Sequence, residues 1–112
     1  VNLIDPHYLS FIDQVLPRVR EKGLGLLGMK SNAMGAIGRA SIAGIEECLR
    51  FAWSQDIDTL VSGVETIDQL EENVQLCKVF EPMTDTEQRR ILSRTAEGKV
   101  GADVENYKRS GA

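Results

Sequence analysis

The chain contains three short apolar segments, and each is followed by a segment with the apolar spacing of a helix. The apolar segments lie at residues 1–4, 24–30 and 58–62. The middle one, LGLLGMK, is apolar without alternation, which is typical of a strand covered on both faces, as in a parallel sheet. Strands that alternate with helices predict βαβ units with parallel strands and right-handed crossovers. The sequence therefore predicts an α/β fold.

The helical patterns carry recognisable start and stop signals. We expect helices over residues 10–22, 41–54, 66–81 and 84–96. Thr66 with Gln69, and Thr84 with Glu87, have the spacing of a capping box. Pro17 interrupts the first pattern and predicts either a kink or the first turn of a second helix.

The pattern also predicts which faces are buried. Ile67, Leu70, Val74 and Cys77 share one side of the third helix and are expected to face the core. Residues 99–112 are expected to form a tail that could contain one helical turn.

A parallel sheet needs both of its faces covered, and a three-stranded sheet with helices on one face leaves the other face open. Either a second copy covers the open face, or the units are an arc of a larger barrel. A βα repeat of a (β/α)8 barrel takes roughly 30 residues, so about three would fit in this chain. A flavodoxin-like doubly wound domain is the other candidate fold, although no Gly-rich loop follows the first segment.

Charge and cysteine usage exclude several classes of protein. The net charge is −4, which argues against a nucleic-acid-binding protein, and no apolar run is long enough for a membrane span. Cys48 and Cys77 lie in helical patterns without a CxxC motif or a nearby histidine, so we expect buried free thiols, no metal site and a cytoplasmic location. Because the first residue is Val1 and not methionine, we expect the chain to be a piece of a longer protein.

Two stretches of the sequence suggest a family. LGLLGMK, followed by EECLRFAWSQDIDTLVSGVETIDQLEENVQLCKVFEPMTDTE, resembles the C-terminal part of a bacterial aldo/keto reductase. The matching features are the small-residue turn Ser62-Gly63, the pair Glu72-Asn73 and the turn 82–84. The resemblance runs from Val1 to about Tyr107.

The resemblance implies the C-terminal portion of a (β/α)8 TIM barrel, with about three βα units and a final helix. The whole chain, 1–112, would then be a partial reductase domain. Residues 1–30 would be a strand-helix-strand unit and residues 31–62 a loop-helix-strand unit. Residues 63–98 would contain a cofactor-end helix and the final helix, and residues 99–112 would be a tail.

The resemblance also implies a cofactor, NAD(P)H, and the residues that contact it. Backbone amides between Gly63 and Asp68 would offer an anion site at a helix start. The cofactor-binding residues it implies are Asn2, Met29, Lys30, Ser62, Gly63, Val64, Gln69, Glu72 and Asn73. Gly63 and Gln69 stand where the family often has basic residues, and Glu65 is close by, so the family's NADP preference does not carry over directly and NAD becomes a credible cofactor.

No catalytic residue is assigned to this chain. The family's tetrad of Asp, Tyr, Lys and His lies in the first half of its barrel, and His7, Tyr8 and Lys30 do not match it by position. We therefore expect the chain to be inactive alone, with nicotinamide cofactor and a small carbonyl substrate as partners of the parent protein. The alternatives are a non-catalytic, self-associating partial-barrel module, which would be a homo-oligomer, and a nucleotide-binding relic.

Overall fold

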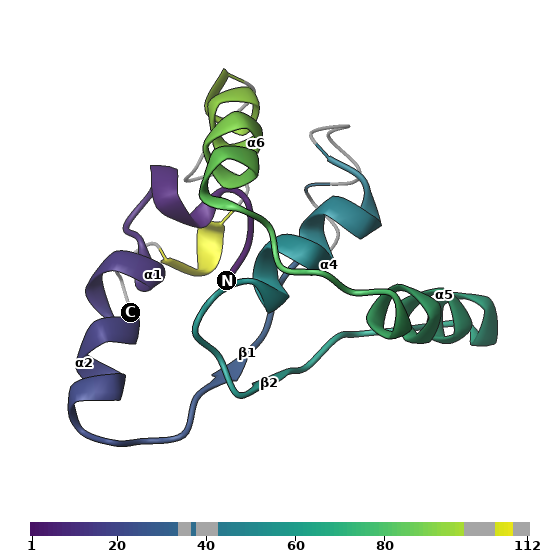
Figure 1. The fold of residues 1–112 in the computed structure, drawn as a ribbon, viewed down its shortest axis with the longest axis horizontal. Helices are drawn as coiled ribbons and strands as arrows, with labels where there is room; N and C mark the ends of the chain where they lie inside the picture. Colours follow the sequence, from purple (N-terminus) through teal and green to yellow (C-terminus); the bar gives the residue numbers. More distant parts are fainter. Residues whose placement is uncertain (34–36, 38–42, 98–104, 109–112) are drawn as a thin grey trace.

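Helices make up most of the structure. The computed structural model describes residues 1–33, 37, 43–97 and 105–108. Its elements, shown in Figure 1, are the 3-10 turn η1 (Asp5–His7), helices α1 (Phe11–Gln14) and α2 (Leu16–Glu21), strand β1 (Leu27–Gly28), helix α4 (Ile45–Trp53), strand β2 (Thr59–Leu60), helices α5 (Ile67–Lys78) and α6 (Asp85–Glu97), and the 3-10 turn η2 (Asn106–Lys108).

The described part of the chain contains one small parallel sheet, formed by β1 and β2. Leu27 pairs with Thr59 and Gly28 with Leu60, and α4 lies in the connection between the two strands. This is a single βαβ unit. The prediction of about three βα units of a TIM barrel is therefore wrong, because the described part of the chain has two short strands and no barrel.

The predicted first strand, residues 1–4, is a turn. The side-chain oxygen of Asn2 accepts hydrogen bonds from the amides of Ile4, at 2.8 Å, and Asp5, at 3.1 Å. A local side-chain bond of this kind competes with strand pairing. Pro6 then falls in the first turn of η1, and Leu3 and Ile4 are fully buried. Leu3 and Ile4 therefore reach the core from a turn and not from a strand.

The segment 24–30 is less buried than its composition predicts. Leu24, Leu27 and Met29 are 53%, 67% and 52% exposed. The expectation of a strand covered on both faces is wrong, because β1 has β2 as its strand neighbour and no second layer of described residues covers these side chains.

The helix signals are largely confirmed. The first pattern breaks next to Pro17 into α1 and α2. Gly23 follows α2 with a φ of +66°, and the amide of Leu24 donates to the carbonyl of Val19 across the helix end. The Thr84–Glu87 capping box is present in both directions, with donor–acceptor distances of 3.1 and 3.4 Å.

Helix α5 has its apolar side exposed. Ile67, Leu70 and Val74 are 73%, 49% and 42% exposed, and Cys77 is exposed as well. Figure 1 shows α5 projecting to one side of the other helices. The predicted inner face of this helix is therefore wrong, since none of its side chains is buried against the described residues.

The core is built around α4 instead. Cys48, Leu49, Phe51 and Ala52 of this helix are buried. Of these, Cys48 and Phe51 belong to one core cluster with residues from several other segments, namely Leu3, Ile4, Ala33, Ile37, Met83 and Ile91.

One arginine of α4 anchors the segment that leads into α6. The Arg50 guanidinium donates to the carbonyls of Glu81, at 2.8 Å, and Pro82, at 3.3 Å. It also forms an ion pair with Glu87 in the first turn of α6. These contacts fix α6 relative to α4 independently of the apolar core.

Truncating an apolar side chain should have a large effect on stability in the core and a small one on the exposed side of α5. Phe51→Ala removes a buried ring and should lower the free energy of unfolding by about 3–5 kcal/mol. The matched variant Ile67→Ala should change the free energy of unfolding of the monomer by less than about 0.5 kcal/mol, because that side chain already lies in water. Urea unfolding followed by circular dichroism measures both. A loss of more than about 2 kcal/mol in Ile67→Ala would show that the α5 face is buried in solution.

Candidate functional site

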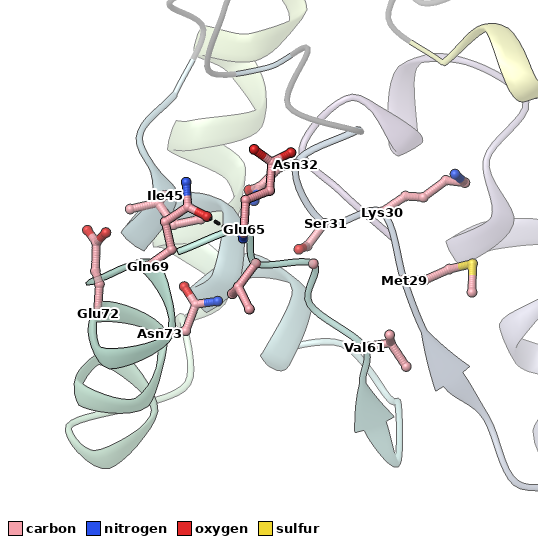
Figure 2. A pocket seen from close by; sticks show the side chains of 12 residues that line it. Met29, Lys30, Ser31, Asn32, Ile45, Val61, Glu65, Gln69, Glu72 and Asn73 are labelled. Atoms are coloured by element: carbon pink, nitrogen blue, oxygen red, sulfur yellow. Dashed lines mark hydrogen bonds between the residues drawn. The ribbon is translucent and has the colours of Figure 1, made fainter. Parts of the chain in front are cut away.

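A cleft lies beside the carboxyl ends of β1 and β2 (Figure 2). It has a volume of about 740 Å³, which is within the size range of small-molecule sites. Its walls come from residues 29–32, which follow β1, from Ile45 of α4, and from residues between Val61 at the end of β2 and Asn73 in α5. Ligands in α/β proteins commonly bind at this end of parallel strands.

Seven of the nine predicted cofactor-binding residues line this cleft: Met29, Lys30, Gly63, Val64, Gln69, Glu72 and Asn73. Ser62 lies beside it, and its hydroxyl oxygen accepts a hydrogen bond of 3.0 Å from the side-chain amide of Asn73. Asn2 lies elsewhere, in a buried cluster described below. The structure thus brings together residues that the sequence separates by more than thirty positions.

The start of α5 shapes one wall of the cleft. The hydroxyl of Thr66 accepts from the amide of Gln69, at 3.2 Å, and the side-chain oxygen of Gln69 accepts from the amide of Glu65, at 2.7 Å. The predicted capping box is therefore shifted by one residue, because Gln69 bonds Glu65 and not Thr66. The amide of Glu65 is engaged and is not free for an anion, whereas those of Ile67 and Asp68 lie at the first positions of the helix.

The cleft is acidic. The carboxylates of Glu65 and Glu72 belong to its lining. Lys30 contributes to the wall, but Figure 2 shows that its side chain extends away from Gln69, Glu72 and Asn73. Its ammonium lies over the ring of Tyr107, 5.0 Å from the ring centroid. The cleft therefore favours neutral or hydrogen-bond-donating groups over dense negative charge.

Five lining residues were not among those predicted, namely Ser31, Asn32, Ile45, Val61 and Glu65. Ser31 and Asn32 follow β1 directly, a position that could have identified them. Ile45 gave no such signal, because its spacing fits a core stripe. The side-chain oxygen of Asn32 is buried and has no hydrogen-bond partner among the described residues. Such an atom is satisfied when a ligand supplies a donor.

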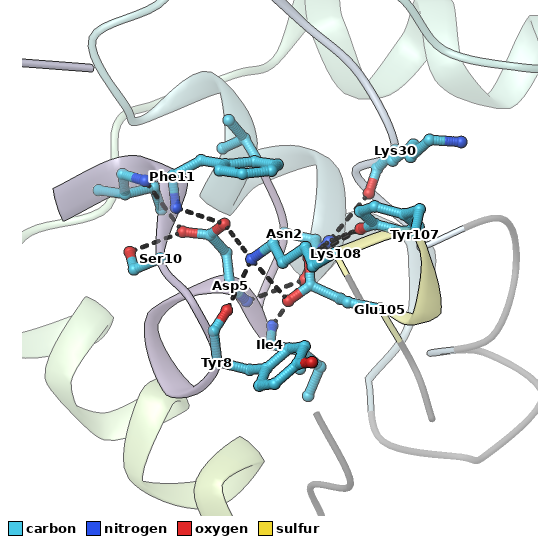
Figure 3. A network of polar contacts seen from close by, with 12 residues as sticks. Asn2, Ile4, Asp5, Tyr8, Ser10, Phe11, Lys30, Glu105, Tyr107 and Lys108 are labelled. Carbon is cyan, nitrogen blue, oxygen red and sulfur yellow. Dashed lines mark hydrogen bonds and ion pairs between the residues drawn. The ribbon is translucent and has the colours of Figure 1, made fainter. Parts of the chain in front are cut away.

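Asn2 belongs to a buried polar cluster, shown in Figure 3. Its side-chain nitrogen donates to the carboxylate of Glu105 at 2.9 Å, to the hydroxyl of Tyr107 at 3.1 Å and to the carbonyl of Lys30 at 3.2 Å. Asn2 is thus fully buried and does not line the cleft, although it contacts the backbone of a residue that does.

The cluster is centred on the ammonium of Lys108. It lies 2.6 Å from Asp5 and 3.0 Å from Glu105, and all three side chains are at most 1% exposed. Burial by itself raises the pKa of Asp5, but hydrogen bonds from Lys108 and from two backbone amides hold that pKa below its ordinary value. Asp5 therefore accepts these bonds as a carboxylate.

The expected tail is in part a docked element. Figure 1 places the C-terminal turn (yellow) beside the N-terminal segment (purple). The end of the turn is tied down, because Lys108 also donates to the carbonyl of Tyr8 at 2.8 Å. The predicted single helical turn exists as η2, but the prediction missed that Glu105 and Lys108 are buried.

The remaining chemically active side chains lie away from the cleft. His7 shares a 3.1 Å hydrogen bond with the hydroxyl of Thr95. Burial raises the pKa of the Cys48 thiol to about 12, so this group is unreactive near neutral pH. Cys77 is exposed, contrary to expectation. Within the described ranges, no cluster of three His, Cys, Asp or Glu side chains is arranged to hold a metal ion.

Comparisons with known proteins give no family assignment. No protein-family model, curated protein or solved structure matches the chain. These comparisons do not test the resemblance to aldo/keto reductases, which stays a prediction. Across the described helices, none is both long and apolar enough to cross a membrane.

Removing the central cation of the cluster should destabilise the protein strongly. Lys108→Met leaves two buried carboxylates without their ammonium partner, and the free energy of unfolding should fall by about 3–5 kcal/mol. Lys22→Met is the control, since Lys22 is exposed, and should have an effect below about 0.5 kcal/mol. Equal unfolding midpoints for both variants in urea would contradict the buried cluster.

Proposed function

We propose that the chain is the nucleotide-binding segment of an NAD(P)H-dependent aldo/keto reductase, and that the cofactor binds in the cleft at the ends of β1 and β2. The observation that carries this proposal is that seven of the residues assigned from the resemblance line this one cleft: Met29, Lys30, Gly63, Val64, Gln69, Glu72 and Asn73. These residues come from the segments that follow β1 and β2, at the end of the parallel strands where α/β proteins commonly bind ligands.

The polar groups of the cleft fit the adenosine end of a dinucleotide. The side-chain oxygen of Asn32, which has no partner among the described residues, can accept a hydrogen bond from a base amino group or a sugar hydroxyl. The carboxylates of Glu65 and Glu72 can accept from the two hydroxyls of a ribose, as an acidic residue does in dinucleotide-binding folds. The apolar side chains of Ile45 and Val61 supply wall area for a base.

The charge of the cleft favours NAD over NADP. A 2′-phosphate would be placed near two carboxylates, with the Lys30 ammonium turned away. The pyrophosphate, which both cofactors share, would lie toward the start of α5, where the helix dipole is positive.

The cofactor supplies a hydride when bound, and this chain's residues bind and orient it. We assign the reduction of a small carbonyl substrate to the parent protein and propose that the chain alone binds nucleotide without turnover. A cytoplasmic location is part of the proposal, because Cys48 and Cys77 are both free thiols.

Binding can be tested with one pair of variants on the same helix. The side chain of Asn73 lines the cleft and bonds Ser62, so Asn73→Leu should weaken NADH binding by about fivefold or more. Gln75→Leu, on the exposed surface of α5, should leave it unchanged. Titration of NADH fluorescence measures both dissociation constants.

The outcomes separate the parts of the proposal. No binding of NADH or NADPH by the natural chain would overturn it, and equal effects of Asn73→Leu and Gln75→Leu would remove the cleft as the site. Turnover of a carbonyl compound by the chain alone would contradict the statement that it lacks catalytic residues.

A second candidate function, self-association without catalysis, is favoured by the exposed apolar side chains. Leu27 and Ile67 are 67% and 73% exposed, and the cleft-lining Met29 and Val61 are about half exposed. Exposed apolar area of this kind marks interaction surfaces. The occupant we propose is a second copy of the chain, which would cover this area and occlude the cleft.

Self-association therefore competes with nucleotide binding. Light scattering coupled to size-exclusion chromatography should show a dimer that Ile67→Glu converts to monomer, while Gln75→Glu, on the same helix, leaves the dimer intact. NADH should shift the equilibrium toward monomer. A monomer at all concentrations would rule out this second function.

A further inference from the structure

The lysine of the cleft wall is held outside the cleft by an aromatic ring. The Lys30 ammonium lies 5.0 Å from the centroid of the Tyr107 ring, within the range of a cation–π contact. Figure 3 shows the Lys30 side chain extending over Tyr107 on the C-terminal turn. The backbone of Lys30 stays on the cleft wall, so rotation of its flexible side chain would be enough to bring the ammonium to a ligand.

The backbone of Lys30 is fixed in an uncommon conformation. Its φ is +56°, in the left-handed region that residues other than glycine seldom adopt. Its carbonyl accepts hydrogen bonds from the side chain of Asn2, at 3.2 Å, and from the amide of Ala33, at 2.9 Å. Such a conformation persists where the surroundings determine it, which marks this position as a constrained one.

The ring of Tyr107 is fixed as well. Its hydroxyl donates to the carboxylate of Glu105 at 2.7 Å and accepts from the side chain of Asn2 at 3.1 Å. Glu105 is itself fully buried and paired with Lys108. The contact between Lys30 and Tyr107 is therefore made by a ring that the buried cluster holds in place.

We propose that Tyr107 is a specificity-determining residue of the cleft, although it does not line it. Because its ring holds the Lys30 ammonium outside the cleft, that ammonium does not neutralise the negative charge of Glu65 and Glu72. The cleft therefore has a lower affinity for ligands with additional phosphate groups. The inference rests on the proposed function, and it assigns the choice between nucleotides of different charge to the C-terminal turn.

The test compares ligands that share adenosine and differ in charge. In Tyr107→Leu the ammonium is released and can face the cleft, so NADPH affinity should rise by about two- to fivefold, the factor expected for an exposed cation–π contact. The affinity for adenosine, which has no phosphate, should not change. Isothermal titration measures the first affinity and chemical-shift titration the second.

Two further variants separate charge placement from damage to the turn. Tyr107→Phe keeps the ring and loses the hydroxyl bonds that orient it, so its gain in NADPH affinity should be smaller than that of Tyr107→Leu. In a Lys30→Met background, Tyr107→Leu should have no effect on NADPH affinity. A gain that persists without Lys30, or an equal change for adenosine and NADPH, would overturn the inference and leave the proposed function standing.

A ligand-free measurement decides the placement of the ammonium. In lysine-labelled protein the ε-methylene protons of Lys30 should resonate upfield because of the Tyr107 ring and return to the ordinary position in Tyr107→Leu, with Lys30→Met providing the assignment. Absence of the upfield shift in the natural chain would overturn the inference. If the shift is present and neither NADH nor NADPH binds, the proposed function fails and the specificity role fails with it.

Discussion

The buried ammonium of Lys108 is the interaction on which the rest of the structure depends most. It lies between Asp5 and Glu105, so removing it would leave two buried carboxylates without their cationic partner. The cluster therefore joins the N-terminal turn to a C-terminal turn about one hundred positions away. Because the same cluster contains Asn2 and Tyr107, it also sets the backbone and the side chain of Lys30. The charge of the cleft is thus decided in part by residues outside it.

The cleft rests on one βαβ unit. Loops at the carboxyl ends of neighbouring parallel strands must lie close together, whatever the size of the sheet. This explains why the predicted binding residues come together although the predicted barrel is wrong. Their placement requires only the pairing of β1 with β2 and the start of α5, both of which the described chain contains.

The apolar face of the sheet and of α5 presents the opposite situation. Its side chains have the spacing of buried residues but lie exposed, as with Ile67 and Leu70. Nucleotide binding and self-association both use this side of the molecule, since Met29 and Val61 belong to the cleft and to the exposed apolar area. For this reason the two proposed functions are in competition and can be measured against each other.

The sequence by itself determined the local features. Pro17 and Gly23 set the break and the end of the first helical region, and Thr84 with Glu87 set the start of α6. These signals act over a few residues, so no tertiary information is needed to interpret them.

Only the tertiary structure decided what covers each apolar face and which polar groups are buried. Residues 1–4 have the composition of a strand, but the side chain of Asn2 bonds the following amides and folds them into a turn. Periodicity shows which side of α5 is apolar and cannot show that none of its side chains is buried against the described residues. Glu105 and Lys108 have the sequence context of a solvated tail. They are buried because Asp5 and Asn2, at the other end of the chain, supply charge and hydrogen bonds that no local pattern records.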